Sequence, residues 1–211
     1  MGTNYTLHIT NEAPEAGTFC VYTKNDSAKM QANLLSLAWF TKAVEQGVKA
    51  NFSWNVDYSF VWSESGTLAK GVHFDVSQKI DADPLASANR KIYFEKGDHG
   101  FHFGDSDRAE EVQEGFLGIT CAENIPPNQA AVGIGISGQA ALAVNAEPRF
   151  QITFEPHITY YVAYGDFIQG EVIDVNQVTR TAYKLVFPAG ETERTIILTS
   201  KNEWNSGDKY P

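Results

Sequence analysis

The 211-residue sequence has few basic residues, two cysteines and no long apolar run. Its 16 Lys and Arg face 26 Asp and Glu, and the net charge of −10 argues against a nucleic-acid or anionic-membrane partner. No apolar run approaches the length of a membrane span. The first residues, MGTNYTLHIT, lack the basic and apolar regions of a secretory signal, so we expect a cytoplasmic protein.

The two cysteines, Cys20 and Cys121, lie far apart and in no nucleophile or metal signature. Cys20 sits in the apolar run Phe19–Tyr22, which predicts a buried free thiol. The missing signal indicates a reducing compartment, where both thiols would stay reduced. A single disulfide between them is the alternative.

Apolar and polar residues alternate from end to end, and clusters of Gly, Pro, Asn and Asp interrupt the pattern. Short, frequent strands of this kind predict an all-β fold, which we expect to be an antiparallel, jelly-roll-like β-sandwich with at most one or two short helices. No linker or internal repeat is apparent, so we expect residues 1–211 to form a single domain. The clearest strands are predicted at Tyr5–Thr10, Thr18–Thr23, Asn51–Ser63, Gly71–Ile80, Arg90–Glu95, Gly115–Thr120, Ala131–Ser137, Ala141–Ala146, Arg149–Glu155, Thr159–Tyr164, Thr181–Phe187 and Arg194–Thr199.

Apolar residues within Met30–Ala38 have helical spacing, and Gly47 would close such a helix, but Ser36–Phe40 also fits a strand. We favour a strand for the second half and leave the first half open. Further on, Val72–Ser77 resumes the alternation of Phe52–Ser63 after a turn, which predicts a hairpin whose rings and aliphatic side chains share one face.

The stretch FSWNVDYSFVWS, Phe52–Ser63, places its rings on one parity and its polar residues on the other, with Val61 as the exception. We expect the ring-bearing side to be core, because an open stripe of this size would be an association hazard. An unbroken strand of this length, at about 3.4 Å per residue, would exceed the usual strand, so we expect it to bend or to change sheets midway. The polar side is a solvated face or the floor of a pocket, with Asn55 and Asp57 as ligand-binding candidates.

The segment Gly133–Gly138 satisfies G-x-G-x-x-G, the dinucleotide fingerprint. No alternation of strands and helices surrounds it, so we favour a strand whose glycines permit close approach of backbones. The sequence has no G-x-S-x-G and no His-Glu-x-x-His, so it predicts no catalytic residues.

The stretch Asp98–Asp107 gathers His and Asp residues and carries the weak metal-ligand candidates His99, His102, Asp105 and Asp107. On a strand the two histidines would face opposite sides, which is poor for joint ligation. The Asp105-x-Asp107 pair lacks the Gly and the distal Glu of an EF-hand loop. We therefore favour a polar hairpin tip, and expect no cofactor.

A second group of candidates lies around His157, which follows a proline and precedes several tyrosines. His157, Tyr160 and Tyr164 would line a ligand pocket if the chain turns them to one side. A purely structural corner is the alternative.

Several long stretches resemble the RhiA family, which is named for a rhizosphere-induced protein of rhizobia. They are FSWNVDYSFVWSESGTLAKGVHFDVSQ at 52–78, SLAWF at 36–40, IPPNQAAVGIGISG at 125–138, TFEPHITYYVAYGDFIQGEVIDV at 153–175 and NEW at 202–204. The similarity covers nearly the whole chain in order, and departs from the family mainly at 81–114. The resemblance implies a soluble bacterial protein whose expression is linked to quorum sensing and plant association. It supplies no enzymatic activity and no catalytic residue.

We therefore expect a non-catalytic binding protein that takes a small-molecule or glycan ligand and can form a homo-oligomer. Two alternatives stay open: a lectin-like module that holds a glycan through Trp, Asp and Asn, and a small-molecule enzyme whose pocket uses Asp57 and His157.

Overall fold

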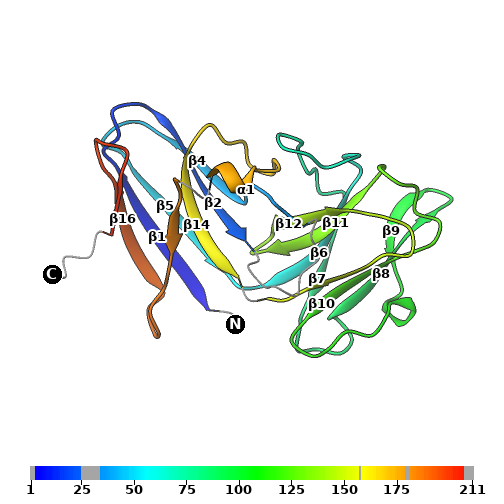
Figure 1. The fold of residues 1–211 in the computed structure, drawn as a ribbon. Coiled ribbons are helices and arrows are strands. Elements are labelled where there is room, and N and C mark those ends of the chain that lie inside the picture. Colours follow the sequence, from blue (N-terminus) through cyan, green and yellow to red (C-terminus); the bar gives the residue numbers. More distant parts are fainter. Residues whose placement is uncertain (1–2, 25–33, 157, 179–180, 207–211) are drawn as a thin grey trace.

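The computed structural model describes residues 3–24, 34–156, 158–178 and 181–206, and strands dominate these ranges (Figure 1). Within them, helix is confined to one 3-10 turn, η1 (Ser106–Arg108), and one short α-helix, α1 (Val175–Val178). The prediction of an all-β fold with at most two short helices is confirmed. In the part of the chain that the structure describes, no helix is long and apolar enough to cross a membrane.

Two four-stranded sheets form what we call the first sandwich, which occupies the left half of Figure 1. One sheet has the order β17-β16-β1-β5, and the other has the order β15-β14-β2-β4. Their strands are β1 (Asn4–Asn11), β2 (Gly17–Lys24), β4 (Phe40–Val44), β5 (Lys49–Asn55), β14 (Thr159–Gly165), β15 (Tyr183–Leu185), β16 (Glu193–Leu198) and β17 (Trp204–Ser206). Aromatic rings pack between the two sheets. The ring centroids of Tyr160 on β14 and Trp54 on β5 lie 5.3 Å apart, and those of Phe19 on β2 and Trp204 on β17 lie 6.0 Å apart.

The second sandwich, in the right half of Figure 1, pairs a four-stranded sheet, β13-β10-β8-β9, with a five-stranded one, β3-β12-β11-β6-β7. Its strands are β3 (Leu35–Ser36), β6 (Tyr58–Ser63), β7 (Gln78–Ala82), β8 (Lys91–Gly97), β9 (Gly100–Gly104), β10 (Leu117–Cys121), β11 (Ala131–Ile136), β12 (Gln139–Asn145) and β13 (Gln151–Phe154). Trp62 of β6 packs 5.7 Å from Phe94 of β8 and 6.0 Å from Phe101 of β9. One continuous cluster of buried apolar residues runs through both sandwiches.

Two contacts depart from the antiparallel sheets that the pattern predicts. β1 runs parallel to β16, and β8 runs parallel to β10. Parallel neighbours need a long crossover connection. Here both connections are long. β1 and β16 come from opposite ends of the chain, and the chain runs from β8 to β10 through β9 and the segment that contains η1. Hydrophobic alternation does not report strand direction, so the sequence pattern could not show this.

The aromatic stretch changes sheets, as its length predicted. β5 lies in the first sandwich and β6 in the second, and Val56 and Asp57 form the link between them, which we call the crossover. The rings on this stretch are core, as expected: Trp54 is 1% exposed and Trp62 is 7% exposed. The same side of the chain therefore lies in the interior of both sandwiches, within one continuous cluster.

The opposite side of this stretch is solvated only in part. Ser53 on β5 is exposed, but Ser59 and Ser63 on β6 are buried. A second apolar cluster covers that face of β6, formed by Leu37, Val61, Leu68, Phe74, Ala131, Ala140, Ala143 and Val172. Sequence alternation predicted a solvated row because it could not foresee the loops that fold over this face.

The predicted hairpin at 71–80 is only half right. β6 does pair antiparallel with β7, but β7 begins at Gln78, and Val72–Phe74 pairs with the residues around Glu171 instead. Phe74 consequently packs on the Val61 side of β6, away from the rings. In the segment that allowed a helix or a strand, residues 30–33 lie outside the described residues, and β3 and β4 confirm strand for the second half.

Candidate functional site

A hairpin turn holds the crossover in place. Ser137 and Gly138 connect β11 to β12 with φ angles of 49° and 81°, the pattern of a type I′ turn. The Ser137 backbone N–H donates to the carbonyl oxygen of Asp57 at 2.9 Å, and its hydroxyl accepts from the backbone N–H of Asn55 at 3.1 Å. The link between the two sandwiches is thus clamped on both sides of Val56.

A hollow of about 530 Å³ opens beside this clamp, and we call it the crossover pocket. The crossover and the first residue of β6 form one wall, and the end of β7 with the following turn forms the other. Its lining residues are Val56, Asp57, Tyr58, Asp81, Ala82, Asp83, Pro84 and Leu85. Every charged group in this lining is a carboxylate.

The three carboxylates differ in their partners. Asp57 accepts from the side-chain amide of Asn55 at 2.5 Å, and Asp83 accepts from the backbone N–H of Leu85 at 2.9 Å. Among the described residues, no side chain or backbone N–H donates to the carboxylate of Asp81. Asp81 is exposed, so its carboxylate keeps its hydrogen-bonding capacity for solvent or a ligand.

Tyr58 is a partly buried residue of the pocket wall. Burial raises the pKa of its phenol, and the neighbouring Tyr160 and Tyr5 raise it further. The hydroxyl therefore stays protonated at physiological pH, and it donates to the backbone carbonyl of Pro156 at 3.4 Å. This hydrogen bond joins the pocket to the segment that leads into β14.

The structure brings only some of the predicted ligand-binding residues together. Asn55 hydrogen-bonds to Asp57, which lines the pocket, and Tyr160 interacts with Tyr58 and packs against Trp54. Burial also raises the pKa of the Tyr160 phenol. Tyr164 lies four residues further along β14, about 13 Å away, and its hydroxyl donates to the backbone carbonyl of Glu15. His157 lies outside the described residues.

The metal-ligand candidates lie on the hairpin of β8 and β9 and on the turn after it. His99 is exposed in the hairpin turn, whereas His102 lies on β9 beside Glu95, with 3.5 Å between Nε2 and Oε1. Asp105 caps η1 by accepting from the backbone N–H of Asp107 at 3.0 Å. In the described ranges, no three His, Cys, Asp or Glu side chains lie close enough together to hold a metal ion.

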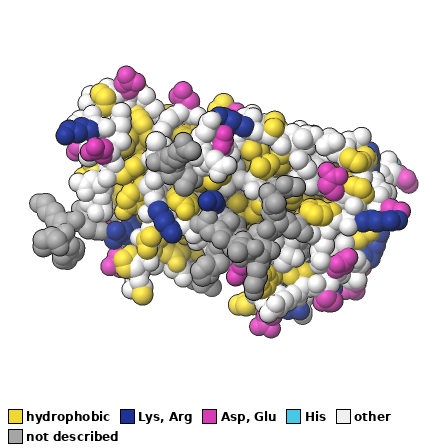
Figure 2. All heavy atoms as spheres, in the orientation of Figure 1, with side chains coloured by type: hydrophobic (Ala, Val, Ile, Leu, Met, Phe, Trp, Pro, Cys, Tyr) yellow, Lys and Arg dark blue, Asp and Glu magenta, His cyan; other side chains and the backbone are white. Residues whose placement is uncertain are grey.

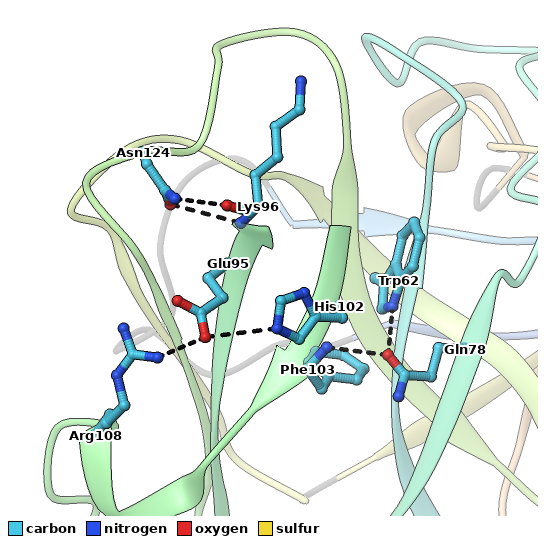
Figure 3. A network of polar contacts seen from close by, with 8 residues as sticks. All are labelled: Trp62, Gln78, Glu95, Lys96, His102, Phe103, Arg108 and Asn124. Atoms are coloured by element: carbon cyan, nitrogen blue, oxygen red, sulfur yellow. Dashed lines mark hydrogen bonds and ion pairs between the residues drawn. The ribbon is translucent and has the colours of Figure 1, made fainter. Parts of the chain in front are cut away.

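Figure 3 shows what this region does instead. The Glu95 carboxylate lies between Arg108 at 2.5 Å and His102, on the outer face of the second sandwich. Nearby, the Gln78 side-chain oxygen accepts from the Trp62 indole N–H at 2.9 Å and from the Phe103 backbone N–H at 3.0 Å. Because β7 and β9 are edge strands of the two sheets, Gln78 closes this side of the sandwich.

The glycine motif is structural, as favoured. Gly133 and Gly135 lie in β11, and the segment after Gly138 is β12, where a dinucleotide site needs a helix. A Cβ on Gly133 would overlap the carbonyl oxygen of Leu142, and a Cβ on Gly135 would overlap the Ser59 hydroxyl. These glycines permit the close pairing of β11 with its neighbours.

Both cysteines are free and buried, which confirms the prediction for Cys20. Burial raises the pKa of the Cys121 thiol to about 12 and also raises that of Cys20. Neither thiol is a reactive nucleophile at neutral pH. On the face shown in Figure 2, the lysine and arginine side chains are scattered among acidic ones and form no single patch.

Sequence reasoning named Asp57 in one wall of the crossover pocket and no residue of the other wall. Asp81, Asp83 and Leu85 were absent from the predicted site because the preceding strand was placed too early, at 71–80. The usable signal was Asp83-Pro84, which marks a turn after a strand. An antiparallel partner ending there would have been placed beside the first residues of β6.

The similarity of this chain to known proteins extends over nearly its whole length. The family model of RhiA matches residues 2–208. Protein RhiA of Rhizobium leguminosarum bv. viciae is 32% identical over 207 residues, which cover 97% of this chain and 86% of that protein. No solved structure matches the chain. A model match and a relative of this coverage confirm the resemblance, and the chain belongs to the RhiA family.

Proposed function

We propose that this protein is a non-catalytic binding protein whose crossover pocket takes a small ligand that carries a positive charge. The observation that supports this proposal is the pocket itself. It is a hollow of about 530 Å³ at the junction of the two sandwiches, and the charged side chains that line it are all carboxylates. This volume lies within the range of about 300–1,000 Å³ that small-molecule sites occupy.

The lining favours a ligand with two chemical parts. Val56, Pro84 and Leu85 offer apolar surface, and Leu85 is 70% exposed, so a ligand has apolar side chain to cover. Asp57, Asp81 and Asp83 offer acceptors to a donor-rich cation. An aliphatic amine has both parts, whereas a carboxylate ligand would be repelled.

The same lining favours binding over catalysis. It contains carboxylates and one protonated phenol, and no histidine, thiol or lysine that would complete a Ser–His, Cys–His or Schiff-base centre. The enzyme alternative needs His157 beside Asp57 and remains a prediction. A link of expression to quorum sensing is an expectation from the family resemblance.

Isothermal titration calorimetry with three matched compounds tests the proposal: hexylamine, hexanol and hexanoate. We expect heat of binding for the amine, much weaker binding for the alcohol and none for the acid. Equal binding of amine and alcohol would show that charge plays no part. Binding of neutral sugars in place of all three compounds would favour the lectin-like alternative.

A further inference from the structure

The two sandwiches are each built from both halves of the chain. The first sandwich combines β1, β2, β4 and β5 from the first half with β14–β17 from the second. The second sandwich combines β6–β9 from the first half with β10–β13 from the second, and takes β3 in addition. Neither half has a complete sandwich of its own.

The strand orders of the two sandwiches match one to one. The sheet β17-β16-β1-β5 corresponds to β9-β8-β10-β13, and both run antiparallel, parallel, antiparallel across their three contacts. The sheet β15-β14-β2-β4 corresponds to β7-β6-β11-β12, and both are antiparallel throughout. Only β3 has no counterpart, because it lies in the longer connection between β2 and β4.

The correspondence extends to the register of individual residues in the parallel contacts. The β1–β16 pairs His8–Thr195, Ile9–Ile196, Thr10–Ile197 and Asn11–Leu198 occupy the places of the β10–β8 pairs Gly118–Lys91, Ile119–Ile92, Thr120–Tyr93 and Cys121–Phe94. Sequence traces remain at these places: Leu-x-Ile-Thr occurs at 7–10 and at 117–120, and Arg-x-Ile occurs at 90–92 and at 194–196. Two unrelated strand sets would share neither the order nor the register.

Each half begins with a unit of four strands, β1, β2, β4 and β5 in the first half and β10–β13 in the second, and the segments that follow these units also correspond. Phe52 pairs with Leu7 and Tyr58 follows six residues later, just as Phe154 pairs with Leu117 and is followed by Tyr160. These two links touch, because the Tyr58 hydroxyl donates to the carbonyl of Pro156. A twofold relation requires the equivalent contact as well, and Tyr160, the equivalent of Tyr58, packs against Trp54, the equivalent of Pro156.

We infer that the chain is an interlocked duplication, and that each half carries a pairing surface that fits a second copy of itself. One half presents two four-strand units, and each unit is completed by the complementary unit of the other half. Two identical halves offer the same pair of complementary surfaces, which is an isologous interface. Residues 3–116 are therefore expected to build both sandwiches as a homodimer, and so are residues 117–206.

The first experiment starts from the full chain. A protease site inserted between Gln113 and Glu114, which are exposed in the connection from β9 to β10, allows cleavage between the halves. After unfolding, separation and refolding, each half is expected to show the circular dichroism of a β protein and twice its own mass by light scattering. Its melting temperature is expected to rise with concentration. As a control, the same site between Gly190 and Glu191 cuts within the second half, and its products should not form homodimers.

The second experiment removes the dependence on concentration, since a short connection holds the halves at millimolar effective concentration. Two copies of residues 3–116 are joined in one chain, which is expected to fold as a monomer with one cooperative unfolding transition. A tandem chain that stays unfolded would overturn the inference. Free halves that refold only when mixed with each other would also overturn it.

Discussion

Replacing Gln78 by alanine removes the acceptor that closes one side of the second sandwich. The side-chain oxygen of Gln78 accepts from the Trp62 indole N–H and from the Phe103 backbone N–H. Trp62 and Phe103 are each 7% exposed, so Gln78→Ala leaves two donors with little access to water. We expect the loss to appear as reduced stability of the whole protein.

The size of the effect follows from these two donors. A buried polar group without a partner costs about 1–3 kcal/mol. Gln78 is itself only partly buried, so water will reach some of the vacated space, and we take the lower end for each donor. The expected loss is about 2 kcal/mol, which lowers the melting temperature of a chain of this size by roughly 4–8 °C.

Urea unfolding followed by tryptophan fluorescence measures this loss. Gln78→Glu keeps an acceptor oxygen at the same position, so it should lose less than half as much as Gln78→Ala. Gln113→Ala removes an exposed glutamine and should stay within about 0.5 kcal/mol of the unchanged protein. If Gln78→Ala is no less stable than Gln113→Ala, closure of the sandwich does not depend on this pair of hydrogen bonds.

Three further predictions concern packing and burial. Gly133→Ala should destabilise the protein more than Gly47→Ala, because the new Cβ meets the backbone of β12 at position 133 and open space, at positive φ, at position 47. Thermal unfolding compares the two variants, and an equal loss of stability would contradict the close pairing of β11 and β12. The Cys121 thiol should resist Ellman's reagent at pH 8 until urea unfolds the chain, and labelling of the native protein would refute its burial. Because folding raises the pKa of this thiol, its contribution to stability should fall from about pH 9 towards pH 12, by up to ~1.4 kcal/mol per pH unit. Iodide should quench the fluorescence of Trp204 but not that of the buried Trp54, so the variant Trp204→Phe should lose most of the quenching. Unchanged quenching in that variant would place the accessible indole elsewhere.

Fold class and core were within reach of the sequence, because alternation of apolar residues reports directly on which side chains are buried. The rings of Phe52–Ser63 lie in the core as predicted, and of the bend or change of sheets that the length of the run indicated, the structure has the change of sheets. Strand direction and the pairing of distant strands were out of reach. Nothing local in β1 shows that its parallel neighbour is β16.

The internal repeat was missed for a related reason. The equivalent residues match mainly at buried positions such as Ile9 and Ile119, and the connections between strands differ in length from one half to the other. A repeat of that kind has no constant spacing in the sequence. Register in the folded chain shows it, because pairing ignores the length of the connecting loops.

The sequence indicated one residue of the pocket lining. Asn55 and Asp57 lie opposite the rings, and Asp57 lines the crossover pocket, whereas Asn55 reaches it only through its hydrogen bond to Asp57. Asp81 and Asp83 reach the same pocket only because β7 pairs with β6 and ends beside Tyr58. That pairing depends on where the strand begins, and the alternation at Val72–Ser77 gave the wrong start.

The most direct test of the proposed function is the affinity of hexylamine for the variant Asp57→Asn/Asp81→Asn, measured beside the control Asp98→Asn. The double variant keeps the shape of the crossover pocket and removes two of its three charges, whereas Asp98 is exposed in the turn between β8 and β9. At separations near 4 Å each exposed charge pair is worth about 1 kcal/mol, so we expect the dissociation constant to rise at least tenfold in the double variant and to stay unchanged in the control. Equal affinity in the double variant and in the control would contradict the assignment of this pocket as a site for cationic ligands.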